Sequence, residues 1–421
     1  MPGAQRHKAA VHHDESKPSL GFLTTLSIVL GVPYAVVLSV LCSAGGKLTK
    51  IAAIHATCFL LAIASYGGIP SLLRALRRKG MCNQNLHRDG DCDKVPEPGS
   101  MWACMLYILY LGVVKLTHTN NHDMMQYREA LISIAIMTLL VRKGVHGLSY
   151  VQGLIDDITP LSLMAKLAAP SIAAIPLCMA FKGETVVITP SITPFIGRAA
   201  FDLGLAYHVA MVLCIVFFAN AINIHAVGQS IIIAMFLLAH NCIEITNNTV
   251  GLIETHKALQ QQLFSVQLIL PFLAINVALL CYNWYPATLF VGNMYTSMAG
   301  AFFAVIATLC NCPGLMMLLF LPQLINFVIS IPQVGLKTTL HTYIYAQIIG
   351  IKYCPRFRTP RFNPNTGLLE HSTNYTLLNT LLWVCGPMTE RRLCVMCLGF
   401  QVVCCAVGLG MHRLISYLGQ P

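Results

Sequence analysis

Two long runs of this chain contain no charged side chain. No Asp, Glu, Lys or Arg occurs from Leu203 to Ile243, and none occurs from Ala258 to Leu336. One membrane-spanning helix needs about 20 mainly apolar residues, so the runs have room for about two and about three such helices. A soluble domain of this size could not remove so much apolar surface from water. The chain is therefore expected to lie in a lipid bilayer.

The bilayer also restricts the secondary structure. Hydrocarbon offers no hydrogen-bond partner to the backbone, so only helices and closed β-barrels can span it. Barrel strands would alternate polar and apolar residues, and these runs do not alternate. The whole chain agrees, with 56% hydrophobic and only 10% charged residues. The sequence thus predicts an all-α polytopic bundle of about 10–11 transmembrane helices.

Hydropathy and charge place eleven expected spans. They lie near residues 20–43, 51–73, 101–114, 130–154, 166–181, 204–224, 228–243, 262–282, 287–310, 313–333 and 393–412. The polar head at residues 1–19 is expected to be disordered and cytosolic. Residues 20–43 are expected to form an extra N-terminal transmembrane helix ahead of a membrane domain at residues 51–418.

An odd number of spans puts the N-terminus and the long polar loops on one side of the membrane. That side holds residues 1–19, 74–100, 155–166 and 334–392, which carry most of the Lys and Arg residues. Cytosolic loops are enriched in these residues. The long loops, and the chemistry with them, are therefore expected to be cytosolic.

Asp156 and Asp157 are adjacent carboxylates at the cytosolic boundary of an expected span. Acids in such a place often bind a cation or a proton, although they can also form a solvated helix end. Lys166 lies at the start of the next span and could bind a phosphate or direct its amine to the interface. Both interpretations stay open for each residue.

Three further patterns are candidates for ligand binding. Asn220 and Asn223 share a helix face and could bind a metal or a polar ligand, or could cap the helix. Arg356 and Arg358, in a proline-bounded loop, could bind phosphate or face anionic lipid. The C-x-x-C pair of residues 394–397 is weak evidence for zinc, because a buried Cys usually behaves as a small hydrophobe.

Several stretches carry a resemblance to one family. They are the Asp156–Asp157 pair, VPE at 95–97, NAIN at 220–223, GQS at 228–230, NWYPATLFVG at 283–292, PQLINFVISIPQ at 322–333, NYTLLN at 374–379 and GPM at 386–388. In this order they resemble the eukaryotic UDP-N-acetylglucosamine–dolichyl-phosphate N-acetylglucosamine-phosphotransferases. That group belongs to the polyprenyl-phosphate N-acetylhexosamine-1-phosphate transferase family.

The resemblance implies an activity and its ligands. The family transfers GlcNAc-1-phosphate from UDP-GlcNAc to dolichyl phosphate with Mg²⁺, giving GlcNAc-PP-dolichol and UMP. This is the first step of lipid-linked oligosaccharide assembly for protein N-glycosylation, at the cytosolic face of the endoplasmic reticulum membrane. Membrane lipid is an expected further partner, a nucleic acid is not, and a homodimer is compatible with the resemblance.

The resemblance also assigns roles to single residues. Asp156 and Asp157 resemble the acidic pair beside the lipid phosphate, with Lys166 as their partner. The other matches are metal ligands at Asn223 and Asn293, a pyrophosphate and sugar clamp at Arg356 and Arg358, and a nucleoside pocket at Glu97 and Phe290.

This chain departs from the family pattern within the expected site. Asn293 replaces an Asp metal ligand, Phe357 replaces a His, and only Lys166 remains of a basic motif. The glycine-rich turn after Asn223 is several residues shorter. A working transferase is the first hypothesis, and the second is a catalytically impaired or inactive relative that binds lipid or a partner. A transporter is a distant third, because few ionisable groups lie within the expected spans.

Overall fold

The computed structural model describes only part of the chain. The described residues are 48–84, 94–117, 128, 130–136, 163–181, 185–188, 200–223, 225–248, 253–330, 360–372 and 376–418. The expected head and first span, and most of the expected span at 130–154, lie outside this part.

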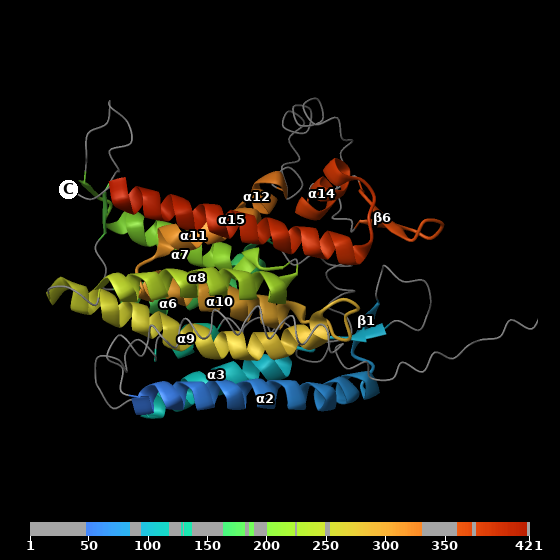
Figure 1. Ribbon diagram of the computed structural model, residues 1–421, viewed down its shortest axis with the longest axis horizontal. Helices are drawn as coiled ribbons and strands as arrows, with labels where there is room; N and C mark the ends of the chain where they lie inside the picture. The colour runs from blue at the N-terminus through green and yellow to red at the C-terminus, as the bar shows by residue number, and fades with distance from the viewer. Residues whose placement is uncertain are drawn as a thin grey trace, which may run out of the picture.

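Helices dominate the described residues, and the longest of them lie side by side along one axis (Figure 1). In the described part of the chain, eight helices have 17 or more residues: α2 (Leu48–Arg78), α3 (Met101–Thr117), α6 (Leu163–Ala180), α7 (Leu205–Ala221), α8 (Ala226–Asn248), α9 (Ile253–Asn283), α10 (Gly292–Leu309) and α15 (Glu390–Leu418). Three are shorter: α11 (Pro313–Leu319), α12 (Leu321–Ser330) and α14 (Leu377–Cys385). Their packing forms one continuous apolar core that runs from α2 to α15.

The described helices confirm the predicted fold class. Four are long and apolar enough to cross a bilayer, namely Ala53–Arg78, Ala226–Asn247, Ala258–Asn283 and Glu390–Tyr417, and the α11–α12 pair counts as a fifth if it is one broken span. Shorter apolar helices include Met101–Leu116 and Leu205–Ala221. The chain is a multi-pass membrane protein, and the count of eleven spans stays a prediction.

The expected straight span at residues 313–333 is broken. Its two parts, α11 and α12, meet at an angle of 70°. Pro322 stands in the first turn of α12, where the ring lacks an N–H and excludes the continuation of a preceding helix. Hydropathy could not reveal the bend, because both parts are apolar.

The described residues include three antiparallel strand pairs that were not predicted from the sequence. They pair β1 (Cys82–Gln84) with β2 (Lys94–Pro96), β3 (Val186–Ile188) with β4 (Ala200–Asp202), and β5 (Arg361–Asn363) with β6 (Leu368–Glu370). Figure 1 shows β1 and β6 at the same end of the bundle. The backbone of Leu369 also pairs with that of Met388, which docks the third hairpin on a small second core.

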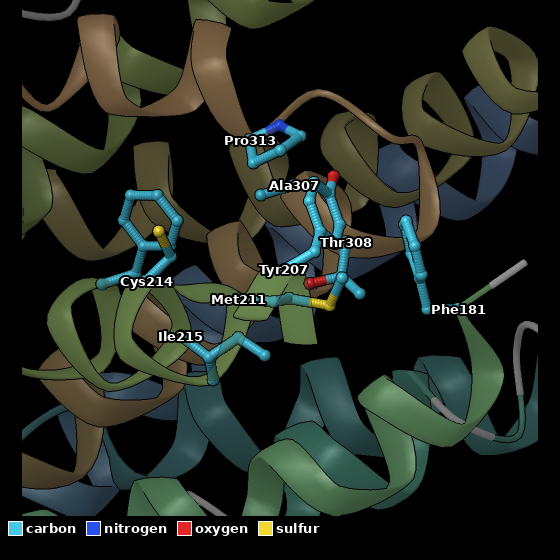
Figure 2. Close-up of a pocket in the computed structure, with 9 residues that line it drawn as sticks. Phe181, Tyr207, Met211, Cys214, Ile215, Ala307, Thr308 and Pro313 are labelled. Atoms are coloured by element: carbon cyan, nitrogen blue, oxygen red, sulfur yellow. The ribbon is translucent and has the colours of Figure 1, made fainter. Parts of the chain in front are cut away.

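The contact between α7 and α10 is unusually close. A Cβ placed on Gly300 would lie 2.4 Å from the carbonyl oxygen of Phe218 and 2.5 Å from Cα of Ala219. At the other end of the pair, Thr308 of α10 shares a small apolar pocket with Tyr207 and Met211 of α7 (Figure 2). The two helices are therefore antiparallel, and the end of α7 lies beside the start of α10. We call this the site end of the bundle, and the opposite one the far end.

Helices α8 and α15 form a second, parallel contact. Near the site end, the Leu398 side chain packs on the backbone of Gly228, where a Cβ would lie 2.9 Å from the Leu398 Cδ2 atom. Toward the far end, the Arg413 Nη1 atom lies 2.7 Å from Glu244 Oε1. Paired charges are the usual form of ionisable residues in membrane helices. The two contacts fix the register of α8 against α15.

Gly300 provides a test of the α7–α10 contact. We expect Gly300→Val to destabilise the protein by about 1–3 kcal/mol, the usual cost of forcing extra carbon atoms into a packed site. Thermal unfolding of the detergent-solubilised protein measures the effect. Gly410→Val on α15 is the matched control, because a Cβ at Gly410 meets nothing within 4 Å. Equal midpoints for the two variants would contradict the close contact.

Candidate functional site

The structure describes four of the nine predicted site residues completely. These are Glu97, Asn223, Phe290 and Asn293. Lys166 lies in the first turn of α6, but its side chain is outside the description. The roles predicted for the remaining four, Asp156, Asp157, Arg356 and Arg358, concern residues outside the described part of the chain.

Phe290 is joined to the segment that contains Glu97 by two backbone hydrogen bonds. The Phe290 N–H donates to the carbonyl of Pro96 at 3.0 Å, and the Gly99 N–H donates to the carbonyl of Phe290 at 2.8 Å. The Ser100 hydroxyl adds a bond to the carbonyl of Val291. Segments almost 200 residues apart in sequence thus form one strand-like pair. The structure thereby brings together the two residues predicted to line a nucleoside pocket.

Two glycines make this approach sterically feasible. A Cβ on Gly99 would lie 2.8 Å from the Cβ of Leu289. Gly292 has φ +73° and faces the Glu97–Pro98 segment, where a Cβ would lie 2.9 Å from Cβ of Pro98 and 3.3 Å from Oε1 of Glu97. Positive φ values favour glycine because it has no Cβ. The Glu97 carboxylate therefore lies directly over the backbone at the start of α10.

The β1–β2 hairpin holds the Glu97 side chain in place. Asn83 of β1 donates through Nδ2 to Oε2 of Glu97 at 2.9 Å, and the Glu97 N–H donates to the carbonyl of Met81 at 3.1 Å. Sequence analysis missed Asn83, because the hairpin that aligns it with Glu97 was not predicted. The two strands have the sequences Lys-Val-Pro and Cys-Asn-Gln, which are too short to predict a hairpin from the sequence.

The two predicted metal ligands lie at the same end of the bundle. Asn223 follows the end of α7 by two residues, and Asn293 is the second residue of α10; both side chains are exposed. Because α7 and α10 are antiparallel, both residues lie at the site end. Their carboxamide oxygens are hard donors of the kind that Mg²⁺ accepts, but they bring no charge. The described residues contain no group of three or more His, Cys, Asp or Glu side chains that could hold a metal.

His225 was not predicted as a site residue. It follows Asn223 by two positions and has φ +49°. Its Nδ1 atom lies 3.4 Å from Sγ of Cys394, the fifth residue of α15. Burial lowers the pKa of His225 to about 4, so its imidazole is neutral near pH 7. The only sequence signal was the shortened turn. Cys397, the other Cys of the C-x-x-C pair, is buried in the second core with Leu369 and Met388.

The site end also carries a set of exposed basic side chains, which we call the basic rim. These side chains come from four places: the end of α2 and the residue after it, strand β2, strand β5 and the start of α15. They are Arg77, Arg78, Lys79, Lys94, Arg361, Arg391 and Arg392. Clustered positive charge attracts anionic ligands such as phosphates. The small pocket of Figure 2 lies toward the far end and is lined mostly by apolar side chains, so it does not belong to this site.

Comparison with known proteins identifies similar sequences. A family model described as glycosyl transferase family 4 matches residues 139–311, a range that includes both Asn223 and Asn293. The chain is 35% identical to a UDP-N-acetylglucosamine–dolichyl-phosphate N-acetylglucosaminephosphotransferase of Dictyostelium discoideum, over 83% of this chain and 86% of the relative. It is 29% identical to the protein of that name from Schizosaccharomyces pombe, over 71% of this chain and 72% of the relative. It is 33% identical to the protein of that name from Saccharomyces cerevisiae, over 62% of this chain and 65% of the relative.

Gly292 provides a test of the predicted nucleoside pocket. We expect Gly292→Ala to weaken UMP binding roughly ten- to a hundredfold, because the new Cβ would displace the Glu97–Pro98 segment and small displacements in a site have effects of this size. Isothermal titration calorimetry with the solubilised protein measures the affinity. Gly367→Ala is the control, since Gly367 has φ +67° but a Cβ there meets nothing within 4 Å. A similar loss of affinity in both variants would show that backbone strain alone is responsible.

Proposed function

Because this chain belongs to the family of UDP-N-acetylglucosamine–dolichyl-phosphate N-acetylglucosaminephosphotransferases, we propose that it transfers GlcNAc-1-phosphate from UDP-GlcNAc to dolichyl phosphate. The observation that carries the proposal is the gathering of Glu97, Phe290, Asn223 and Asn293 at one end of the bundle. The basic rim at the same end supports a donor that carries a pyrophosphate.

The proposed reaction needs no covalent bond between the protein and the substrate. An oxygen of the lipid phosphate attacks the β-phosphorus of UDP-GlcNAc, the bond from that phosphorus to the bridging oxygen breaks, and UMP leaves. Phosphoryl transfer of this kind depends mainly on positioning and on stabilisation of the phosphate charge. The protein must therefore hold a nucleotide in the cytosol and a lipid phosphate at the membrane surface at the same time.

Different predicted residues are assigned to the nucleotide and to the lipid phosphate. Glu97 and Phe290 hold the nucleoside, and Arg356 and Arg358 bind the pyrophosphate and sugar. Asp156 and Asp157 are assigned to the lipid phosphate with Lys166 as their partner, because an expected membrane boundary is where that phosphate lies. The support for these roles is the family resemblance together with the pairing of the Glu97 and Phe290 segments.

Mg²⁺ is the proposed cofactor. Asn223 and Asn293 would hold it through carboxamide oxygens, and when bound it would neutralise part of the pyrophosphate charge. Since neither ligand is charged, the donor's own phosphate oxygens would supply most of the attraction for the ion. This chain would therefore bind magnesium less tightly than relatives with an Asp in place of Asn293.

The proposed location is the endoplasmic reticulum membrane, with the site end in the cytosol. The basic rim supports this orientation, because cytosolic loops are enriched in Lys and Arg. A homodimer is compatible with the family resemblance and stays a prediction.

A second candidate function is a non-catalytic relative that binds lipid or a partner. The neutral pair of Asn223 and Asn293 favours it, since an active relative would place a carboxylate at the second position. The two candidates differ in whether UMP is released from UDP-GlcNAc when dolichyl phosphate is present.

The acidic pair provides the test of the proposed function. We expect the double change Asp156→Asn and Asp157→Asn to lower the transferase rate at least about 100-fold, as the loss of positioned acid–base or charge partners commonly does. Microsomes that contain the protein are assayed for UMP and for lipid-linked GlcNAc. Asp202→Asn is the control, since this exposed acid belongs to the β3–β4 hairpin that precedes α7, at the far end. An unchanged rate in the double variant would refute the assigned role, and an inactive wild-type protein would favour the second candidate.

The magnesium requirement provides a second test. We expect Asn293→Asp to lower the magnesium concentration at half-maximal rate about 10- to 100-fold, because a charge instead of a dipole adds about 1.4–3 kcal/mol of metal binding. Asn311→Asp is the control: Asn311 is exposed and follows the C-cap residue of α10, at the far end of the bundle. Binding of Mn²⁺ is measured alongside the rate, so the metal role can be judged without turnover. Identical metal dependence in wild type and Asn293→Asp would contradict the role of Asn293.

A further inference from the structure

The turn between α7 and α8 is short and tightly placed. Helix α7 ends at Ala221 and α8 begins at Ala226, with Ile222 buried and Asn223 exposed between them. Successive residues of an extended chain span at most about 3.6 Å each, so the Cα atoms of Asn223 and His225 can be no more than about 7 Å apart. A contact that holds His225 in place therefore also limits the positions that Asn223 can take.

His225 adopts a backbone conformation that side-chain-bearing residues rarely take. Its φ of +49° lies in the left-handed region, where Gly is the usual residue and Asn, Asp and His are the commonest exceptions. Such a conformation persists where the surrounding contacts hold it. The His225 carbonyl accepts a hydrogen bond from the Gln229 N–H, and its imidazole contacts Cys394, whose Sγ lies 3.4 Å from Nδ1.

The His225–Cys394 contact continues into the packing of α8 on α15. Gly228 and Leu398, three and four residues further along the two segments, form the next contact of the same pair of helices. The Glu244–Arg413 ion pair holds the same two helices near the far end. These contacts hold α15 against α8. Cys394 on α15 therefore has a defined position, and a bond to it restrains the turn that contains His225.

We propose that His225 and Cys394 form a latch that holds the shortened α7–α8 turn against α15 and thereby positions Asn223 for the pyrophosphate and its cation. The imidazole Nδ1 atom of His225 and the thiol of Cys394 form a weak hydrogen bond between two partly buried side chains. The latch takes the place of the longer glycine-rich turn of the family. The part of this inference that concerns Asn223 rests on the proposed function, and His225 acts as a positioning residue, not a catalytic one.

Cys394→Ala tests the positioning role. We expect it to raise the KM for UDP-GlcNAc and the half-maximal magnesium concentration about three- to tenfold, the range for loss of one hydrogen bond, with a smaller change in kcat. Cys394→Ser should restore part of the loss, because its hydroxyl can still donate to the imidazole.

Cys397→Ala is the matched control. Cys397 lies one turn further along α15, where it is buried and packs in the second core. We expect this variant to lower the thermal midpoint without changing the KM or the magnesium requirement. Equal effects of Cys394→Ala and Cys397→Ala on the KM would overturn the positioning role.

Thiol labelling tests the latch without any catalytic readout. The full-length protein is treated briefly with N-ethylmaleimide, whose double bond adds the thiol sulfur and its proton, and labelling of Cys394 is measured by mass spectrometry. We expect His225→Gly to speed Cys394 labelling about three- to tenfold, while Cys385, which is already exposed, serves as the internal reference. Unchanged protection of Cys394 in His225→Gly would refute the latch. Faster labelling of Cys394 in a protein without transferase activity would leave the latch standing and the proposed function refuted.

Discussion

The close antiparallel contact of α7 with α10 determines where the candidate site lies. Gly300 lets the backbone of α10 meet that of α7 at Phe218 and Ala219, so the end of one helix and the start of the other reach the same level. Asn223 and Asn293 follow from these two termini. The loop before α10 then carries Phe290 back to Pro96 and Gly99. The proposed nucleoside and metal-binding parts of the candidate site thus depend on one helix–helix contact.

The bilayer explains which parts of this fold could be predicted from the sequence. Charge-free runs must be helices in hydrocarbon, so the long helices and the fold class followed from composition and hydropathy. The 70° bend between α11 and α12 could not be predicted in this way, because both halves are apolar. The three short hairpins were missed because strands of three residues leave almost no period to detect.

The candidate site was predictable only in part, and for a different reason. The resemblance named Glu97 and Phe290, and backbone hydrogen bonds join their segments. Their role as a nucleoside pocket stays a prediction. Asn83, which bonds the Glu97 carboxylate, depends on the pairing of β1 with β2. His225 meets Cys394 across 169 positions of sequence. Such partners are set by tertiary packing and leave no local pattern, so they could be found only from the three-dimensional structure.

The electrostatics of the site end bear on how a donor and a cation would bind. The two proposed metal ligands, Asn223 and Asn293, are neutral carboxamides, whereas the exposed rim carries seven Lys and Arg residues. A cation alone would meet net repulsion from the rim, but a nucleoside diphosphate would be attracted to it. The phosphates would then supply the negative oxygens that Asn223 and Asn293 lack. For the proposed reaction, the cation is therefore expected to arrive with the donor or after it, and the position of Asn223 matters most once the pyrophosphate is bound.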